Sequence, residues 1–217
     1  LIRQPRDGEE LIAFYRDFRS RHGTRPTASE VQHAGFNPAR TGHTGWIGFV
    51  ADMDDLTQAQ HHAWMAHKDL LDEIETSRMT QSYKMLVLRA MIEASALPGQ
   101  ITLSELVDRI ARMARRNPQI KADLSVDPED ASQLRAMLLQ QPLKILAQTA
   151  WFQLGPDTFG TTFDQTDACD LIPLISELVD WRLLRHFHTR DVVYDLPEHT
   201  NLAGAAEDPG IAPTPPA

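Results

Sequence analysis

The chain has 217 residues, of which 42% are hydrophobic and 24% are charged, a composition that suits one large globular domain or two small ones. No apolar run approaches the roughly 18 residues of a membrane-spanning helix, so we predict no contact with a membrane. The single cysteine, Cys169, excludes an internal disulfide and a cysteine-based zinc module, and it fits a cytoplasmic location.

The net charge of −9 is distributed unevenly along the chain. Residues 78–118 contain seven Lys and Arg against three Asp and Glu, whereas residues 147–217 contain three against eleven. An acidic protein is a poor nucleic-acid ligand overall, but a basic segment can bind phosphates locally. The central segment therefore favours a nucleic-acid partner, and the acidic last third favours a protein partner.

Residues 1–56 predict a helix-turn-helix-like unit of three short helices. Apolar spacing indicates a first helix over Glu9–Arg21, and Thr27 with Glu30 forms a capping box that opens a second helix. A third helix follows the Gly42–Gly45 loop. Its apolar side chains should form the core of this unit: Trp46, Ile47, Phe49, Val50 and Met53.

Residues 57–78 predict one long and largely polar helix that connects this unit to a second one, residues 79–197. In the second unit, Thr80 should cap a helix that runs to Pro98-Gly99. A second capping box, Thr102 with Glu105, opens a helix that stops at Asn117-Pro118. A third helix should run from Asp127-Pro128 to Gln141.

The turn Gly155-Pro156-Asp157 between two segments of strand-forming residues predicts a β-hairpin. A further helix over Asp170–Phe187 and a short strand at Val192–Tyr194 should follow, and residues 198–217 should be disordered. Three helices followed by a hairpin is the order of a winged-helix domain. The expected fold is mainly α: a helix-turn-helix-like unit joined by a long helix to a winged-helix-like unit with one β-hairpin.

Two groups of motifs resemble known sequences. Arg25-Pro26-Thr27, Glu30 and Thr44-Gly45-Trp46 resemble a small DNA-binding repeat that accompanies homing endonucleases and some helicases, in which Gly-Ser-Trp occupies the last place. Met79-Thr80-Gln81-Ser82-Tyr83-Lys84-Met85 and Leu178–Leu183 resemble the C-terminal region of bacterial superfamily-2 DEAD/DEAH-box helicases, some of them from restriction or phage-defence systems. Gln81 replaces a lysine of that pattern.

The resemblance implies a parent protein that performs ATP-driven work on DNA. The chain itself contains no Gly-x-x-x-x-Gly-Lys-Ser/Thr loop and no Asp-Glu-Ala-Asp-like box, so we predict that it hydrolyses no ATP. The partners that the resemblance implies are DNA, the helicase motor domain of the same parent chain, and a nuclease or methyltransferase. We expect no cofactor.

The strongest candidate for phosphate contact is the row Arg109, Arg112 and Arg116, with Arg115 beside it. Spacings of three and four residues place the first three on one helix face, opposite the apolar face. Guanidinium groups in a row match successive phosphates through bidentate hydrogen bonds. The alternative is an ordinary solvated face of an amphipathic helix.

The third helix of a winged-helix domain usually enters the major groove. Here its outward side chains would be Ser132, Gln133 and Arg135, which can hydrogen-bond base edges or phosphates. Acidic residues at the start of this helix would repel phosphates, and many winged helices bind protein instead. Further phosphate contacts are predicted around the first unit and the helix after the connector, from Arg25, Arg40, His43 and Lys84.

No metal site or catalytic site is predicted. His61, His62 and His67 lack the spacing that presents two imidazoles on one helix face, and His186, His188 and Asp191 form only a loose group. The function that the sequence favours is a DNA-binding accessory region of a bacterial helicase, without its ATPase motor. The alternative is a protein-interaction adaptor that docks a helicase to a restriction or defence partner.

Overall fold

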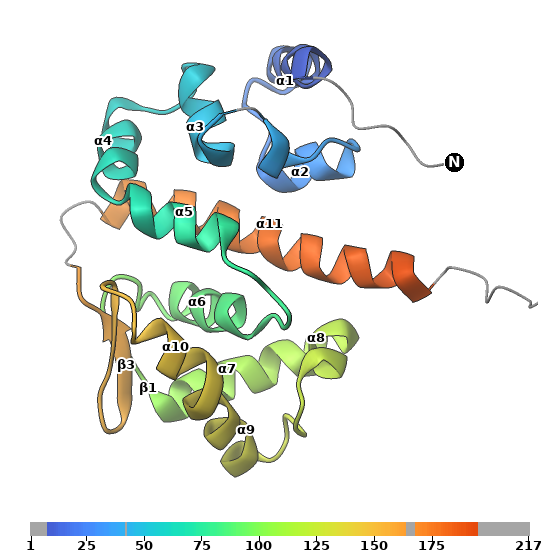
Figure 1. Cartoon of the computed structure of the whole chain (residues 1–217). Helices are drawn as coiled ribbons and strands as arrows, with labels where there is room; N and C mark the ends of the chain where they lie inside the picture. Colours follow the sequence, from blue (N-terminus) through green and yellow to red (C-terminus); the bar gives the residue numbers. More distant parts are fainter. Residues whose placement is uncertain (1–7, 42, 164–167, 195–217) are drawn as a thin grey trace, which may run out of the picture.

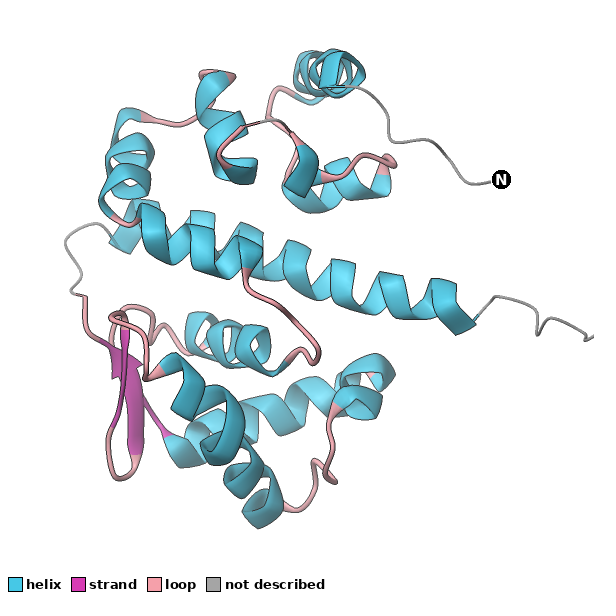
Figure 2. Ribbon diagram, in the orientation of Figure 1, coloured by secondary structure: helices cyan, strands magenta, loops and turns pink. Residues whose placement is uncertain are grey.

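A computed structural model describes residues 8–41, 43–163 and 168–194. The chain is mainly helical and has one three-stranded antiparallel sheet, as Figures 1 and 2 show, which confirms the predicted class. The predicted disorder of residues 198–217 lies outside the described part. No helix in the described part is long and apolar enough to cross a bilayer.

The first unit contains the three predicted helices, α1 (Gly8–His22), α2 (Ala28–His33) and α3 (Gly45–Asp52), with a short 3-10 turn η1 (Pro38–Arg40) before α3. The predicted capping box at the start of α2 is present in full. Tyr15, Trp46 and Phe49 are fully buried, and the Tyr15 and Phe49 rings meet edge to face at 5.3 Å. Trp46 is therefore a core residue, as predicted.

The prediction of one long connecting helix was wrong. Residues 57–78 form two helices, α4 (Gln58–Ala66) and α5 (Lys68–Thr76), separated at His67, whose φ of −118° and ψ of 26° leave the helical region. A second capping box, Thr57 with Gln60, begins α4. Both helices pack against the long helix near the end of the chain, and both contain buried apolar side chains.

The second unit begins with α6 (Tyr83–Glu93), strand β1 (Gln100–Thr102) and α7 (Leu103–Arg116). The predicted cap at Thr80 was wrong, because α6 begins after Ser82. Thr102 Oγ1 accepts from Glu105 N at 3.1 Å, but the return bond from a full capping box is absent because the Glu105 carboxylate pairs with Arg109.

Asn117 ends α7 and also caps α8 (Pro118–Asp123), a helix that was not predicted. Helix α9 (Ala131–Leu138) begins at the Asp130 cap, a few residues later than the predicted start at Asp127-Pro128. It continues past the predicted end through a π-helical turn, η2 (Leu139–Leu143), into α10 (Lys144–Leu146). Pro142 lies inside this turn. Proline has no N–H to donate, so it disrupts a regular α-helix, and the wider π-helical turn accommodates it here.

The predicted β-hairpin is confirmed as β2 (Phe152–Leu154) and β3 (Thr158–Thr161). Strand β1 was not predicted, and it pairs with β3 so that the sheet order is β1-β3-β2. Ile101 faces Phe159 in this register, and both are buried. The close approach of the strands requires Gly160, because a Cβ there would lie 2.7 Å from the Gly99 carbonyl oxygen.

The last helix, α11 (Ala168–Tyr194), runs across the middle of the molecule between the N-terminal helices and the α6–α10 unit (Figure 1). The predicted strand at Val192–Tyr194 was wrong, because these residues continue the helix. Helix α11 packs against α2, α4, α5 and α6. Its buried residues include Leu171, Leu174, Leu178 and Trp181, so one helix provides core to both predicted units.

Candidate nucleic-acid interface

Helix α7 places its basic residues on the face predicted from the sequence. Leu103, Leu106 and Ile110 are buried on one side, and Arg112 and Arg116 are exposed on the other. Among the described residues neither Arg112 nor Arg116 has an ion-pair partner. These two guanidinium groups lie one helical turn apart and remain available for phosphates.

The other two arginines of α7 have acidic partners. Arg109 Nη2 lies 2.8 Å from Glu105 Oε1, and only 22% of its side chain is exposed. Arg115 Nη1 lies 3.2 Å from Glu129 Oε2 in a more exposed pair. The predicted row of three arginines, with Arg115 beside it, therefore carries less free positive charge than the sequence indicated, and Arg112 and Arg116 are the strongest candidates for phosphate contact.

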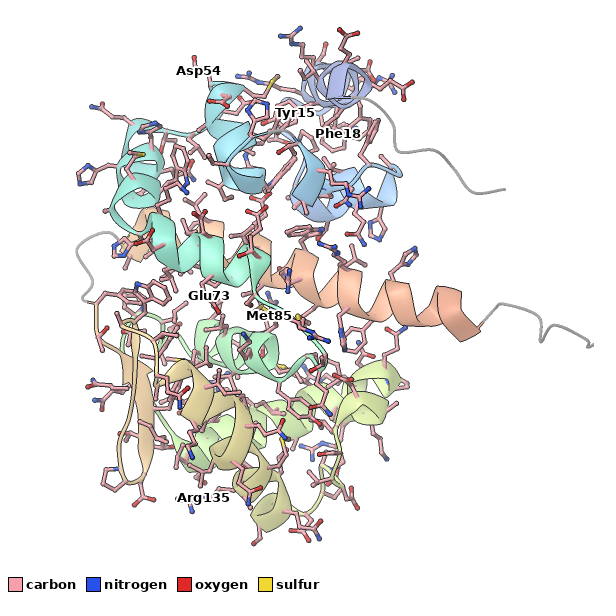
Figure 3. The ribbon with its side chains drawn as sticks, viewed as in Figure 1. Tyr15, Phe18, Asp54, Glu73, Met85 and Arg135 are labelled. Carbon is pink, nitrogen blue, oxygen red and sulfur yellow. The ribbon has the colours of Figure 1, made fainter. Side chains whose placement is uncertain are left out.

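The outward residues of α9 also have acidic neighbours. Gln133 Nε2 donates to Asp130 Oδ2 at 2.8 Å, and Arg135 Nη2 lies 2.8 Å from Asp157 Oδ1 in the hairpin turn. Figure 3 shows Arg135 at the outer edge of α9. A depression of about 580 Å³ lies between α7, α9 and the hairpin turn. The polar residues that line it include Thr102, Ser104, Asp108, Ser132 and Thr158.

Arg25 points into the protein and binds Glu177 of α11. Its Nη1 and Nη2 donate to the two carboxylate oxygens at 3.0 and 2.6 Å, and 19% of the Arg25 side chain and 8% of the Glu177 side chain are exposed. Burial alone would lower the pKa of Arg25, but the hydrogen bonds and charge of Glu177 raise it. Arg25 is therefore part of the protein interior and not of the candidate interface.

The same carboxylate holds two more groups of the first unit. Ala28 N donates to Glu177 Oε1 at 2.9 Å, and the indole Nε1 of Trp46 donates to it at 2.6 Å. Two residues of the Arg-Pro-Thr…Gly-Trp motif, Arg25 and Trp46, thus bind one buried acceptor. In this chain the motif attaches the N-terminal helices to α11.

The remaining predicted contacts are dispersed. Arg40 is exposed on η1 and has no ion-pair partner among the described residues. His43 Nδ1 contacts the Asp52 carboxylate. Lys84 lies 3.6 Å from Glu73, at the junction of α5 and α6 that the Glu73 and Met85 labels mark in Figure 3, and 19% of its side chain is exposed. The structure does not bring these three residues to the exposed face of α7.

A second basic surface was missed by the sequence reasoning. We call it the basic pocket: a cavity of about 790 Å³ between η1, the start of α3, the segment after α5 and the C-terminal half of α11. Its wall contains three arginines, Arg78, Arg182 and Arg185, together with His43 and His186. Arg182 and Arg185 are one turn apart on α11. This spacing is the feature of the sequence that could have indicated a basic surface here.

The acidic residue in the wall of the basic pocket is Glu75. Trp46 N donates to its two carboxylate oxygens at 2.8 and 3.0 Å, so Glu75 caps the N-terminus of α3, where Thr44 provides no side-chain cap. Burial raises the pKa of Glu75 to about 7, although this hydrogen bond lowers it. Gly45 is required beside it: its φ is 84°, and a Cβ would lie 2.5 Å from Glu75 Oε2.

The second helicase-like motif lies along the same pocket. Met79 and Thr80 line it, and the following residues bind Asp123 of α8: Ser82 N donates to Asp123 Oδ2 at 2.7 Å, and Tyr83 Oη donates to the Asp123 carbonyl oxygen. Burial would raise the pKa of Asp123, but hydrogen bonds from His186 and Ser82 outweigh it and lower the pKa. His186 is thus paired with a carboxylate.

No group of three potential metal-ligating side chains occurs within the described part of the chain. Comparisons with protein-family models, with curated proteins and with solved structures found no match. The helicase relationship therefore stays a prediction that rests on the short motifs alone.

Proposed function

We propose that this chain binds DNA through α7, α9 and the β2–β3 hairpin, arranged as a winged helix. The support is the element order: α6, β1, α7, α9 and then a hairpin, with β1 joining the hairpin to complete an antiparallel sheet. In this arrangement α9 is the recognition helix and β2–β3 is the wing. The additional helix α8 between α7 and α9 is a departure from the simplest form.

The observation that carries the proposal is the pair Arg112 and Arg116. Both are exposed, they share one face of α7, and neither has an ion-pair partner within residues 8–41, 43–163 and 168–194. Two uncompensated guanidinium groups at this spacing can bind adjacent phosphates of one strand. Such contacts position a protein on DNA without reading its sequence.

The motif resemblance supplies the context of this binding. We propose that the chain is an accessory region of a bacterial DEAD/DEAH-box helicase and holds DNA while the motor domain of the parent protein translocates. The chain lacks the phosphate loop and the acidic metal box, so the ATPase cycle belongs to that motor.

A protein-interaction adaptor is the second candidate, and a specific observation favours it. Arg115, Gln133 and Arg135, which would extend the DNA surface from α7 across α9, are bound to Glu129, Asp130 and Asp157. A surface of paired opposite charges suits a protein partner such as a nuclease or methyltransferase better than a polyanion.

Titration of the whole chain with labelled duplex and labelled single strands, at low and at moderate salt, distinguishes the two candidates. The DNA proposal predicts binding at low salt that weakens steeply as salt increases, because phosphate contacts release counterions. Absence of binding to either DNA form at low salt would contradict it and leave the adaptor as the better account.

A further inference from the structure

We propose that the basic pocket binds a phosphate group, at a site separate from the α7–α9 surface. The pocket draws its wall from three distant parts of the sequence: the region before α3, the segment after α5, and α11. None of its lining residues belongs to α7, α9 or the hairpin, so the site does not depend on the proposed winged-helix contacts.

The charge of the wall favours an anion. Arg78, Arg182 and Arg185 contribute three guanidinium groups, against one carboxyl group from Glu75. The Glu75 carboxylate accepts from Trp46 N and is 5% exposed, so it is committed to the fold. A phosphate matches guanidinium groups through paired, charge-assisted hydrogen bonds.

The arginines differ in how they are held. Arg182 is buried and donates to the carbonyl oxygens of Glu75 and Ser77, which fixes its guanidinium at the end of α5. Arg185 is half-buried with its Cζ 5.7 Å from the centre of the Trp181 ring. Arg78 is exposed and has no ion-pair partner within the described residues. The wall thus combines two positioned cations with one at the rim.

Repulsion between these cations gives an independent reason to expect an anion. Burial and then the neighbouring charge of Arg185 lower the pKa of Arg182. The negative charges of Glu75 and Glu73 offset only part of this effect, because the pKa of Arg182 stays lowered, and an anion bound beside both arginines would favour their charged forms.

The size of the pocket limits the ligand. A volume of about 790 Å³ exceeds what a lone phosphate needs and accommodates a nucleotide or one residue of a strand. Met79 and Ala39 provide apolar wall beside the cations. The shared chemistry is a phosphate group, and its source is a free nucleotide or a nucleic-acid strand.

The test is a titration of the isotope-labelled whole chain with pyrophosphate at constant ionic strength, followed by backbone amide shifts. We expect saturable shifts at residues 76–80 and 182–186. Arg78→Ala with Arg185→Gln should weaken the affinity at least about tenfold, because two charge-assisted contacts are lost. Arg16→Ala with Arg21→Gln, which removes the same charge from α1, should leave it unchanged.

Either of two results would overturn the proposal: no saturable shifts at the basic pocket, or equal affinity in the pocket variant and the α1 control. If Arg185→Gln disturbs the fold, Arg78→Glu alone on the exposed rim gives the same decision. A thymidine monophosphate titration and an oligothymidylate titration then separate the sources: equal affinity assigns a nucleotide, and a tighter oligomer assigns a strand. Because the shifts are followed at residues 76–80 and 182–186, and no residue of α7 lines the basic pocket, failure here differs from failure of the DNA proposal.

Discussion

At the scale of residues, Glu177 is the most connected side chain of the N-terminal attachment. Its carboxylate accepts four hydrogen bonds, two from Arg25, one from Ala28 N and one from the Trp46 indole. Removing a donor from a buried carboxylate costs free energy, because the charge then loses part of what replaces its hydration. The short motif that resembles a DNA-binding repeat therefore has a clear structural use in this chain.

Glu177→Gln should lower the free energy of unfolding by about 3 kcal/mol, because the amide nitrogen places a donor against the donors of Arg25 and leaves that buried cation unpaired. Denaturant unfolding measures this loss. The matched control is Asp17→Asn on α1, which breaks the exposed pair with Arg21 and should cost less than about 1 kcal/mol. Equal losses in the two variants would contradict the role of Glu177.

Glu75 should make stability depend on pH. Burial raises its pKa from 4.5 to about 7 in the folded protein. The unfolded chain therefore releases this proton first, so the contribution of Glu75 to the free energy of unfolding is fully present below about pH 4.5 and is lost as pH rises towards 7, by about 3 kcal/mol. Glu75→Gln keeps an oxygen for Trp46 N and should abolish this pH-dependent component between about pH 4.5 and pH 7. Parallel stability curves for the two proteins would refute the assignment.

At the scale of elements, the sequence predicted the features that depend on neighbouring residues: helix starts, turns and the buried faces of helices. Thr27 with Glu30 predicts the start of α2 because a capping box satisfies the free N–H groups of a helix. The Gly155-Pro156 turn predicts the β2–β3 hairpin, and apolar spacing predicts the buried face of α7. The exposed positions of Arg112 and Arg116 follow from that spacing.

Other features depend on packing between distant segments, so the sequence did not reveal them. The helix breaks at His67, although no glycine or proline lies there to indicate a break in the sequence. The two helices on either side of the break both pack on α11. The valines before Tyr194 favour a strand by propensity, but they extend a helix. The basic pocket joins Arg78 to Arg182, and the pairing of Arg25 with Glu177 likewise needs the folded chain.

Asp123 should stabilise the junction between α6, α8 and α11. Asp123→Ala removes the acceptor for Ser82 N and the partner of buried His186, and we expect a loss of about 3 kcal/mol in the free energy of unfolding. Asp157→Ala, which breaks the exposed pair with Arg135, is the control and should cost less than about 1 kcal/mol. A small loss for Asp123→Ala would show that the junction does not depend on this carboxylate.

At the scale of the whole molecule, α11 is the structural centre. It packs against helices of both predicted units, and it also contributes Glu177 to the N-terminal attachment and Arg182 and Arg185 to the basic pocket. The net charge of −9 means that any binding of DNA must be local to surfaces such as the exposed face of α7. The molecule thus carries two separate basic surfaces within an acidic chain.

The most direct test of the DNA proposal is the salt dependence of duplex binding by the whole chain and by the Arg112→Ala, Arg116→Ala variant. We expect the double change to weaken binding to all sequences alike and to lower the slope of log affinity against log salt by about 2, one for each lost phosphate contact. Arg16→Ala with Arg21→Ala on α1 should leave the slope unchanged. An unchanged slope in the α7 variant would show that Arg112 and Arg116 do not contact phosphates, and it would place any DNA-binding surface elsewhere on the molecule.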